Sequence, residues 1–241
     1  MAALRRAALA VLVAALLLVL ILAAIAGLRA NPEDLPWTPL HLSQPVGLFT
    51  GRKLAGLHGK GPKCEKLLTE AGVRFEAAPP ITDGICGYAD GLRLAAGGAR
   101  RIALAPAGPV MACPVAAGLA MWEWNIVQPA AQRYLGAPVV AIEHLGAYNC
   151  RPVRGSSTTL SEHGTADAID VSAFRLADGT RITLSGDWKG DGPRATFLHT
   201  VRNGACKLFA TVLSPEYNAA HRNHLHLDQA PRGAMGWRAC R

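Results

Sequence analysis

The stretch "AIDVSAFRLADGTRITL", residues 168–184, carries the strongest turn signal in the chain. Two runs that alternate apolar and polar residues flank Asp178 and Gly179. An Asp-Gly pair between such runs is typical of a tight β-hairpin. A second alternating run, "HLHLD" at residues 224–228, predicts a further strand. The two segments are therefore predicted to belong to a small antiparallel sheet.

Segments with the spacing of helices surround these strands. Residues 117–136 predict a helix centred on residues 121–127 that restarts at Pro129, because proline is tolerated in the first turn of a helix. Residues 193–209 also have helical spacing, and residues 137–150 begin as a Val- and Ile-rich strand that leads to a turn. Helices mixed with antiparallel hairpins predict an α+β fold, with packed helices beside the small sheet.

An apolar segment opens the chain. Residues 7–28 carry no charge and are mostly Ala, Leu, Val and Ile. About 20 apolar residues suffice to cross the hydrocarbon core of a bilayer as a helix, and the arginines before this run favour a cytoplasmic N-terminus. The small residues at 24–27 also fit the cleavage site of a signal peptide. Residues 1–30 are therefore predicted to be a transmembrane anchor or a signal segment, and both export the rest.

The remainder divides into two parts. Residues 31–47 contain four prolines and no apolar period, so residues 31–59 are predicted to form a Pro-rich tether. Residues 60–241 are long enough for one domain with a sizeable core. Hydrophobic residues make up 50% of the chain and charged residues 17%, and this balance excludes a disordered polar chain.

Cysteine usage agrees with export. There are six cysteines, an even number, and none forms a Cys-x-x-Cys pair. In an oxidising compartment they predict up to three disulfides, whose pairing the sequence leaves open. Zinc binding by thiolates is the alternative, but nothing here has the required ligand spacing. The disulfide candidates are Cys64, Cys86, Cys113, Cys150, Cys206 and Cys240.

The formal net charge is +8. A basic exported body suits anionic neighbours such as phospholipid head groups or wall polymers. Solubility alone is the alternative explanation of this charge.

Four of the eight histidines lie in two short segments, "SEHGTADAID" at 161–170 and "HRNHLHLD" at 221–228. Alternation along a strand puts His224 and His226 on one face, opposite the intervening leucines. By the same rule Asp170 faces away from its apolar neighbours. If the two strands are adjacent, imidazole and carboxylate groups from separate segments converge.

Such a convergence is the raw material of a zinc site. Zinc takes neutral imidazole and carboxylate ligands, and a catalytic site has three protein ligands and one open position. His163, Asp170 and His226 would supply this set for a single Zn²⁺. His224, close to the metal but not bound to it, is the candidate for moving protons during hydrolysis.

Several motifs together resemble a known family. "SEHGTADAID" resembles the Ser-x-His-x-x-Gly-x-Ala-x-Asp signature of the zinc D-Ala-D-Ala carboxypeptidases, and "HLH" is similar to the His-x-His element of related peptidoglycan endopeptidases. With "WEWNIVQPAAQRYLG", "YNCR" and "LSPEYNAAHRNHLHLD", they resemble the bacterial extensin-like C-terminal domain family over about residues 60–241. The resemblance implies a zinc-peptidase-like domain with a carboxypeptidase- or hedgehog-like fold, at the periplasmic face of the inner membrane.

The resemblance also implies the same three zinc ligands and a catalytic role for His224. The chain departs from the signature at Ala166, which stands where the carboxypeptidases have glycine. It departs again at Asn223, which stands where those enzymes place a glutamate base. With that base absent, proton transfer would fall to His224.

Four further polar residues are candidates for supporting the ligands or binding substrate. Ser161 occupies the signature serine and would support the ligands. Arg151 would grip a substrate carboxylate or the oxyanion, or else form a surface salt bridge. His221 is a second proton carrier or a solvated loop residue. Asp228 either orients a ligand or simply ends its strand.

Three classes of function fit parts of this pattern. An exported zinc hydrolase would cleave amide bonds in peptidoglycan peptides, as a carboxypeptidase or an endopeptidase. A non-catalytic module would bind the cell wall or a partner protein and keep a structural zinc. A nuclease is suggested by "HRNH", but His-Asn-His nucleases place the final histidine on a helix, whereas "HLHLD" predicts a strand. We therefore expect the hydrolase and no nucleic-acid partner.

Overall fold

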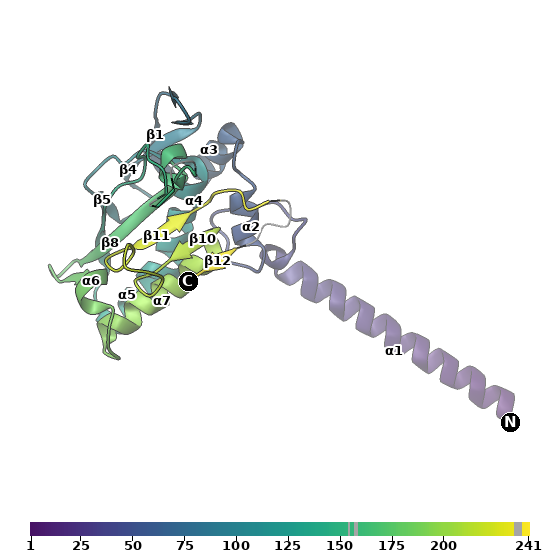
Figure 1. Ribbon diagram of the computed structural model, residues 1–241. Coiled ribbons are helices and arrows are strands. Elements are labelled where there is room, and N and C mark those ends of the chain that lie inside the picture. Colours follow the sequence, from purple (N-terminus) through teal and green to yellow (C-terminus); the bar gives the residue numbers. More distant parts are fainter. Residues whose placement is uncertain (154, 157–158, 234–237) are drawn as a thin grey trace.

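The computed structural model describes residues 1–153, 155–156, 159–233 and 238–241 (Figure 1). A long N-terminal helix, α1 (Ala2–Ala30), projects from a body in which helices and strands pack around one main core. The predicted α+β class is confirmed.

The main sheet has seven strands among the described residues, in the order β12-β10-β11-β8-β7-β5, with β9 paired to β8 beside this path. It is larger than the small antiparallel sheet expected, and it is mixed, because β5 pairs with β7 and β10 pairs with β12 in parallel. Parallel neighbours need a long crossover connection, and a helical segment supplies it between β5 and β7. The strands are β5 (Ala103–Ala105), β7 (Val139–His144), β8 (Ala168–Leu176), β9 (Arg181–Thr183), β10 (Thr211–Leu213), β11 (Leu225–Asp228) and β12 (Ala239–Cys240).

The hairpin predicted from Asp178-Gly179 joins β8 to β9. Phe174 on β8 lies opposite Ile182 on β9. Gly179 has a φ of 87°, in the left-handed region that glycine adopts without a steric cost. The turn chemistry and the strand pattern of this segment agree.

The crossover is one nearly continuous helical segment. It consists of α4 (Cys113–Trp122), a π-helical turn η2 (Glu123–Val127) and α5 (Gln128–Leu135). The helix predicted over residues 117–136 is thus confirmed, but it starts earlier and passes through a wider turn instead of restarting at Pro129. Proline has no N–H to bond the carbonyl four residues back, and the π turn lies directly before it.

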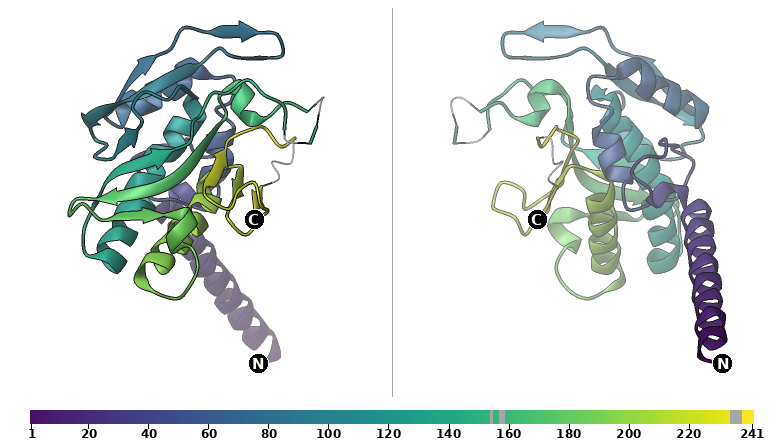
Figure 2. Two further views of the ribbon diagram at one scale, coloured as in Figure 1. Left: turned by 60° about the vertical axis from the view of Figure 1, so that its left-hand side comes forward. Right: turned by 90° about the vertical axis from the view of Figure 1, so that its right-hand side faces the viewer.

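This helical segment and α7 (Pro193–Leu208) cover one face of the main sheet (Figures 1 and 2). Phe174 of β8 packs against Trp122, with ring centroids 5.8 Å apart, and edge-to-face against Phe197, at 5.1 Å. Leu225 and Leu227 of β11 are fully buried in the same core. Because side chains alternate along a strand, the polar residues of β8 and β11 project from the opposite face.

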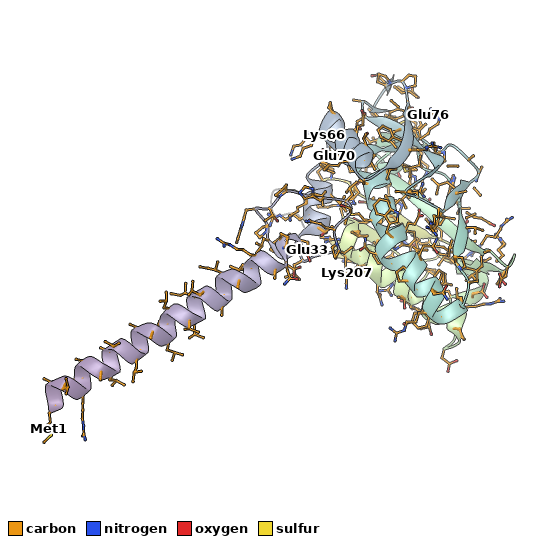
Figure 3. All side chains as sticks on the ribbon, turned by 180° about the vertical axis from the view of Figure 1, so that it is seen from behind. Met1, Glu33, Lys66, Glu70, Glu76 and Lys207 are labelled. Atoms are coloured by element: carbon orange, nitrogen blue, oxygen red, sulfur yellow. A yellow bond between two sulfur atoms is a disulfide. The ribbon has the colours of Figure 1, made fainter. Side chains whose placement is uncertain are left out.

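A second group of elements packs beside the main sheet. It contains a three-stranded sheet in the order β1-β4-β6 and the hairpin β2-β3. Lys66 and Glu70 lie on the outer surface of the helix α3, with Lys66 Nζ 3.8 Å from Glu70 Oε1 (Figure 3). The remaining bounds are α3 (Gly61–Glu70), β1 (Val73–Ala77), β2 (Ile81–Asp83), β3 (Cys86–Tyr88), β4 (Gly91–Gly98), β6 (Met111–Ala112) and α6 (Leu184–Asp187).

All six cysteines are paired, as predicted. One disulfide joins α3 to α4, one joins β3 to the loop after β7, and one joins α7 to β12. The pairs are Cys64–Cys113, Cys86–Cys150 and Cys206–Cys240.

The N-terminal helix α1 has no buried residue, and its apolar side chains point outward on all sides (Figure 3). Its most apolar stretch has a mean hydropathy of 3.3, so the helix is long and apolar enough to cross a membrane. A signal sequence can have the same length and composition. This helix and the three disulfides together suggest an exported protein.

The segment 31–59 differs from the extended tether expected. It contains a 3-10 turn, η1 (Pro32–Asp34), and a short helix, α2 (Thr50–Ala55). Leu42 and Leu54 belong to the main core and are at most 2% exposed. The prolines suppress a regular period, but the leucines between them still bury apolar surface, so much of the segment packs on the body. The boundary at residues 59 and 60 stays a prediction.

Candidate metal centre

The pairing of β11 with β8 builds the site. These strands are antiparallel neighbours, and His226 is the direct partner of Asp170 in their register. The adjacency that the sequence analysis required is therefore present. A short 3-10 turn, η3 (Glu162–Thr165), precedes β8 and brings His163 to the same point.

Three side chains meet there. His226 Nδ1 is 3.0 Å and His163 Nε2 is 3.2 Å from Asp170 Oδ1, and the two nitrogens are 3.2 Å apart. Bonds of about 2.0–2.1 Å to a tetrahedral ion place two ligand atoms about 3.3 Å apart. The group of His163, Asp170 and His226 therefore fits one metal ion.

The outer hydrogen bonds leave the correct nitrogens free. His163 Nδ1 lies 2.6 Å from the carbonyl oxygen of Ala147, which can only accept, so Nδ1 donates and Nε2 keeps its lone pair. His226 Nε2 lies 3.2 Å from the carboxylate of Asp228, so Nε2 donates, and Nδ1 would offer its lone pair to a metal ion that displaces its proton. Partners of this kind fix the tautomer and the ring orientation of metal-binding histidines. Both lone pairs point to the shared centre.

Burial and charge act together on these groups. Burial raises the pKa of Asp170, but hydrogen bonds with His163 and His226 outweigh it and hold that pKa far below the ordinary carboxyl range. Burial lowers the pKa of His226, whereas its bonds to Asp170 and Asp228 prevail and raise it to about 9. Without a metal, the three side chains thus form an ionised carboxylate beside two histidines, and the protonated form of His226 is favoured. A metal ion bound at Nδ1 would take the place of that proton.

His224 stands next to this group, outside it. Its Nε2 is 3.5 Å from Asp170 Oδ1, and its Nδ1 is 2.9 Å from Asn223 Oδ1, which accepts. Burial lowers the pKa of His224, so its neutral form is favoured. Its Nε2 therefore lies on the side of the centre, and its role as a proton carrier stays a prediction.

The centre opens into a cavity of about 780 Å³. Histidines and carboxylates line it together with apolar side chains such as Val153, Leu160 and Tyr217. Arg151 also lines it. A side chain or short peptide of a substrate has room to approach the three ligands.

A comparison with protein families bears on the same residues. The family model described as extensin-like protein C-terminus matches residues 62–241. The chain belongs to the extensin-like C-terminal family. Comparison with curated proteins and with solved structures found no significant match. In this extensin-like domain the match spans η3, β8 and β11, and therefore the whole candidate centre.

The four supporting residues predicted for the extensin-like domain all line the same cavity. Ser161 begins η3, and its hydroxyl accepts a long bond of 3.4 Å from the His163 N–H. His221 Nδ1 lies 2.8 Å from Asn218 Oδ1. Burial and the positive charge of its histidine neighbours lower the pKa of His221 to about 4. Their roles stay predictions.

Three residues that contribute to the candidate centre were not predicted from the sequence. Ala147 contributes its backbone carbonyl, and a backbone contact of this kind cannot be predicted from the type of residue. Asn223 was noted as a departure but not as the partner of His224. Arg232, in the loop after β11, contacts both Asp228 and Glu162. Arg232 is four positions after Asp228 in the sequence, but outside a helix that spacing does not predict a contact.

Proposed function

We propose that this chain is an exported zinc-dependent hydrolase of amide bonds in the peptide part of peptidoglycan. The observation that carries the proposal is the set of ligand atoms of His163, Asp170 and His226, which lie 3.0–3.2 Å from one another beside a cavity. Zinc bound there would supply a Lewis acid that activates water for attack on a carbonyl.

An open ligand position favours catalysis over a purely structural metal. Structural zinc sites in proteins are almost always closed by four protein ligands, whereas catalytic sites use three. The described residues that fit one ion here number three, and His224 lies outside that group. All three of these residues line the cavity, from which a substrate would approach them.

His224 is the proposed proton carrier. Its Nδ1 donates to Asn223, so its Nε2 is available to take a proton at the centre. The same nitrogen would then give that proton to the amine that leaves when the amide breaks. This role replaces the glutamate that carboxypeptidases place at the position of Asn223.

Wall peptides are the proposed substrate because three features agree. The chain is basic, with a net charge of +8, and peptidoglycan peptides carry carboxylates. Arg151 lines the cavity and is proposed to meet such a carboxylate. The N-terminal helix would hold the domain at the periplasmic face of the inner membrane, within reach of the wall, unless it is removed as a signal.

Mass spectrometry of fragments released from purified peptidoglycan tests this proposal. The zinc-loaded full chain in detergent is compared with a chelated sample and with His224→Ala. Peptide fragments that appear only with zinc and only with His224 would support the hydrolase, and their masses would identify the bond. No release from several wall types, with zinc demonstrably bound, would instead indicate a non-catalytic wall- or partner-binding module.

A further inference from the structure

Arg232 lies at the edge of the candidate centre, and its two ion pairs are with residues other than the three ligands. It follows β11 and lines the same cavity. Its Nη2 is 3.0 Å from Asp228 Oδ2 and 3.4 Å from Glu162 Oε1. Asp228 accepts a hydrogen bond from the ligand His226, and Glu162 directly precedes the ligand His163 in the sequence. The guanidinium therefore connects the two elements that bring histidines to the metal.

Asp228 needs such a partner. Its side chain is only 1% exposed, and an ionised carboxylate at that depth requires nearby donors or positive charge. Oδ1 accepts the backbone N–H of Ala230 at 3.2 Å, while Oδ2 receives both His226 Nε2 at 3.2 Å and Arg232 Nη2 at 3.0 Å. Arg232 brings a permanent positive charge to this set.

The geometry points to Arg232 as a positioning residue for the metal centre. We infer that it holds the Asp228 carboxylate against His226 Nε2, so that His226 presents Nδ1 to the metal. The inference rests on the metal centre of the proposed function and needs no hydrolysis. A direct role in substrate binding is a separate possibility, which would leave metal affinity untouched.

Zinc affinity of the full chain, measured by competition with a chromogenic chelator in the absence of substrate, tests the inference. The variants are Arg232→Gln, Arg232→Lys, Asp228→Asn and the double variant Asp228→Asn/Arg232→Gln. Arg194→Gln is the matched control, because Arg194 also pairs with one aspartate, Asp187 at 3.2 Å, away from the centre. The melting temperature of each metal-free variant is recorded in parallel.

We expect Arg232→Gln to weaken zinc binding about 10- to 100-fold, the usual effect of losing a partner behind a metal ligand. Arg232→Lys keeps the charge and should recover much of this loss. If Arg232 acts through Asp228, the double variant should bind zinc no more weakly than Asp228→Asn alone. Arg194→Gln should bind like the unmodified chain.

Three results would overturn the inference. Zinc affinity of Arg232→Gln within twofold of the unmodified chain would remove its positioning role, as would losses that add in the double variant. Equal losses in the Gln and Lys variants, matched by equal falls in metal-free melting temperature, would show a merely structural role. If the unmodified chain binds no zinc, both this inference and the proposed function fail. If zinc binds but no wall peptide is cleaved, only hydrolysis fails.

Discussion

His226 faces Asp170 directly across the antiparallel pairing of β11 with β8, and their ligand atoms are 3.0 Å apart. A shift of one residue in this register would turn every side chain of β11 to the other face. Leu225 and Leu227 oppose such a shift, because it would expose both. The hydrophobic core therefore fixes the geometry of the centre, and η3 has only to add the third ligand.

Replacing His224 should separate metal binding from catalysis. His224→Ala leaves the three ligands in place, so zinc binding should persist while hydrolysis falls by about 10²- to 10⁴-fold, the usual contribution of general acid–base catalysis. Zinc content and peptidoglycan fragment release are measured on the same sample. A control is His199→Ala, since His199 bonds the Trp188 carbonyl instead. Full activity in His224→Ala would remove His224 from the mechanism.

Removing the Cys86–Cys150 disulfide should weaken the metal centre as well as the fold. This disulfide spans 64 residues and anchors the loop in which the Ala147 carbonyl accepts from His163. The double variant Cys86→Ser/Cys150→Ser should lose about 2–5 kcal/mol of stability. Zinc affinity should also fall, because the ring of His163 loses its fixed partner.

The disulfide Cys206–Cys240 provides the control for this experiment. It joins α7 to β12 and touches no ligand of the centre. Its removal should lower the melting temperature while the zinc affinity of the folded chain stays the same. Equal zinc affinities after loss of either disulfide would contradict the role given to the Cys86–Cys150 loop.

Gly204 should be intolerant of even one methyl group. It is buried in α7, where a Cβ would lie 2.6 Å from Ile126 Cγ1 on the π-helical turn. Alanine normally favours a helix by about 1 kcal/mol over glycine. Here the clash should prevail, so Gly204→Ala should destabilise by about 1–3 kcal/mol in denaturant unfolding. Asn203→Ala, at the exposed neighbouring position, should be neutral or stabilising.

Glu143 should make stability depend on pH in the acid range. Bonds from Arg181 and Arg175 lower its pKa from the ordinary 4.5 to about 2. The folded chain therefore gains stability from the ionised carboxylate above about pH 4.5 and loses it as the pH falls toward 2. Solvent screens the half-exposed arginines, so Glu143→Gln should cost less than about 1 kcal/mol at neutral pH.

Denaturant unfolding of Glu143→Gln across this range provides the measurement. The difference from the unmodified chain should be constant above about pH 5 and shrink toward zero near pH 2. A difference that grows on acidification would contradict the assignment. Asp178 is unsuitable as a control because backbone bonds within its own turn already lower its pKa.

The strands, and the face that each residue occupies on them, could be predicted because both depend on neighbouring residues in the sequence. The alternation of β11, the Asp-Gly turn of β8 and β9, and the helical spacing of α7 each depend on neighbouring residues in the sequence. The ligand set followed from the same alternation and from the position of His163, shortly before Asp170 in the sequence. The parallel strands β5 and β12 were not predicted, because both are short and their partners lie far away in the chain.

Contacts that loop residues make with distant elements could not be predicted at all. Arg232 reaches Asp228 and Glu162 through a chain path that has no period. At Ala166 the structure explains why glycine stands at this position in the signature, but not why this chain has alanine. Ala166 closes η3 with a φ of 60°, in the left-handed region, and this is the position where the carboxypeptidase signature has glycine.

Metal stoichiometry in the unmodified chain and in Asp170→Ala tests the central claim most directly. After equilibrium dialysis against zinc, elemental analysis should find one zinc ion per unmodified chain and far less in Asp170→Ala. Asp191→Ala, an exposed aspartate before α7, should retain the full amount. Equal zinc in the Asp170→Ala variant and the unmodified chain, or none in the unmodified chain, would contradict the metal centre described for His163, Asp170 and His226.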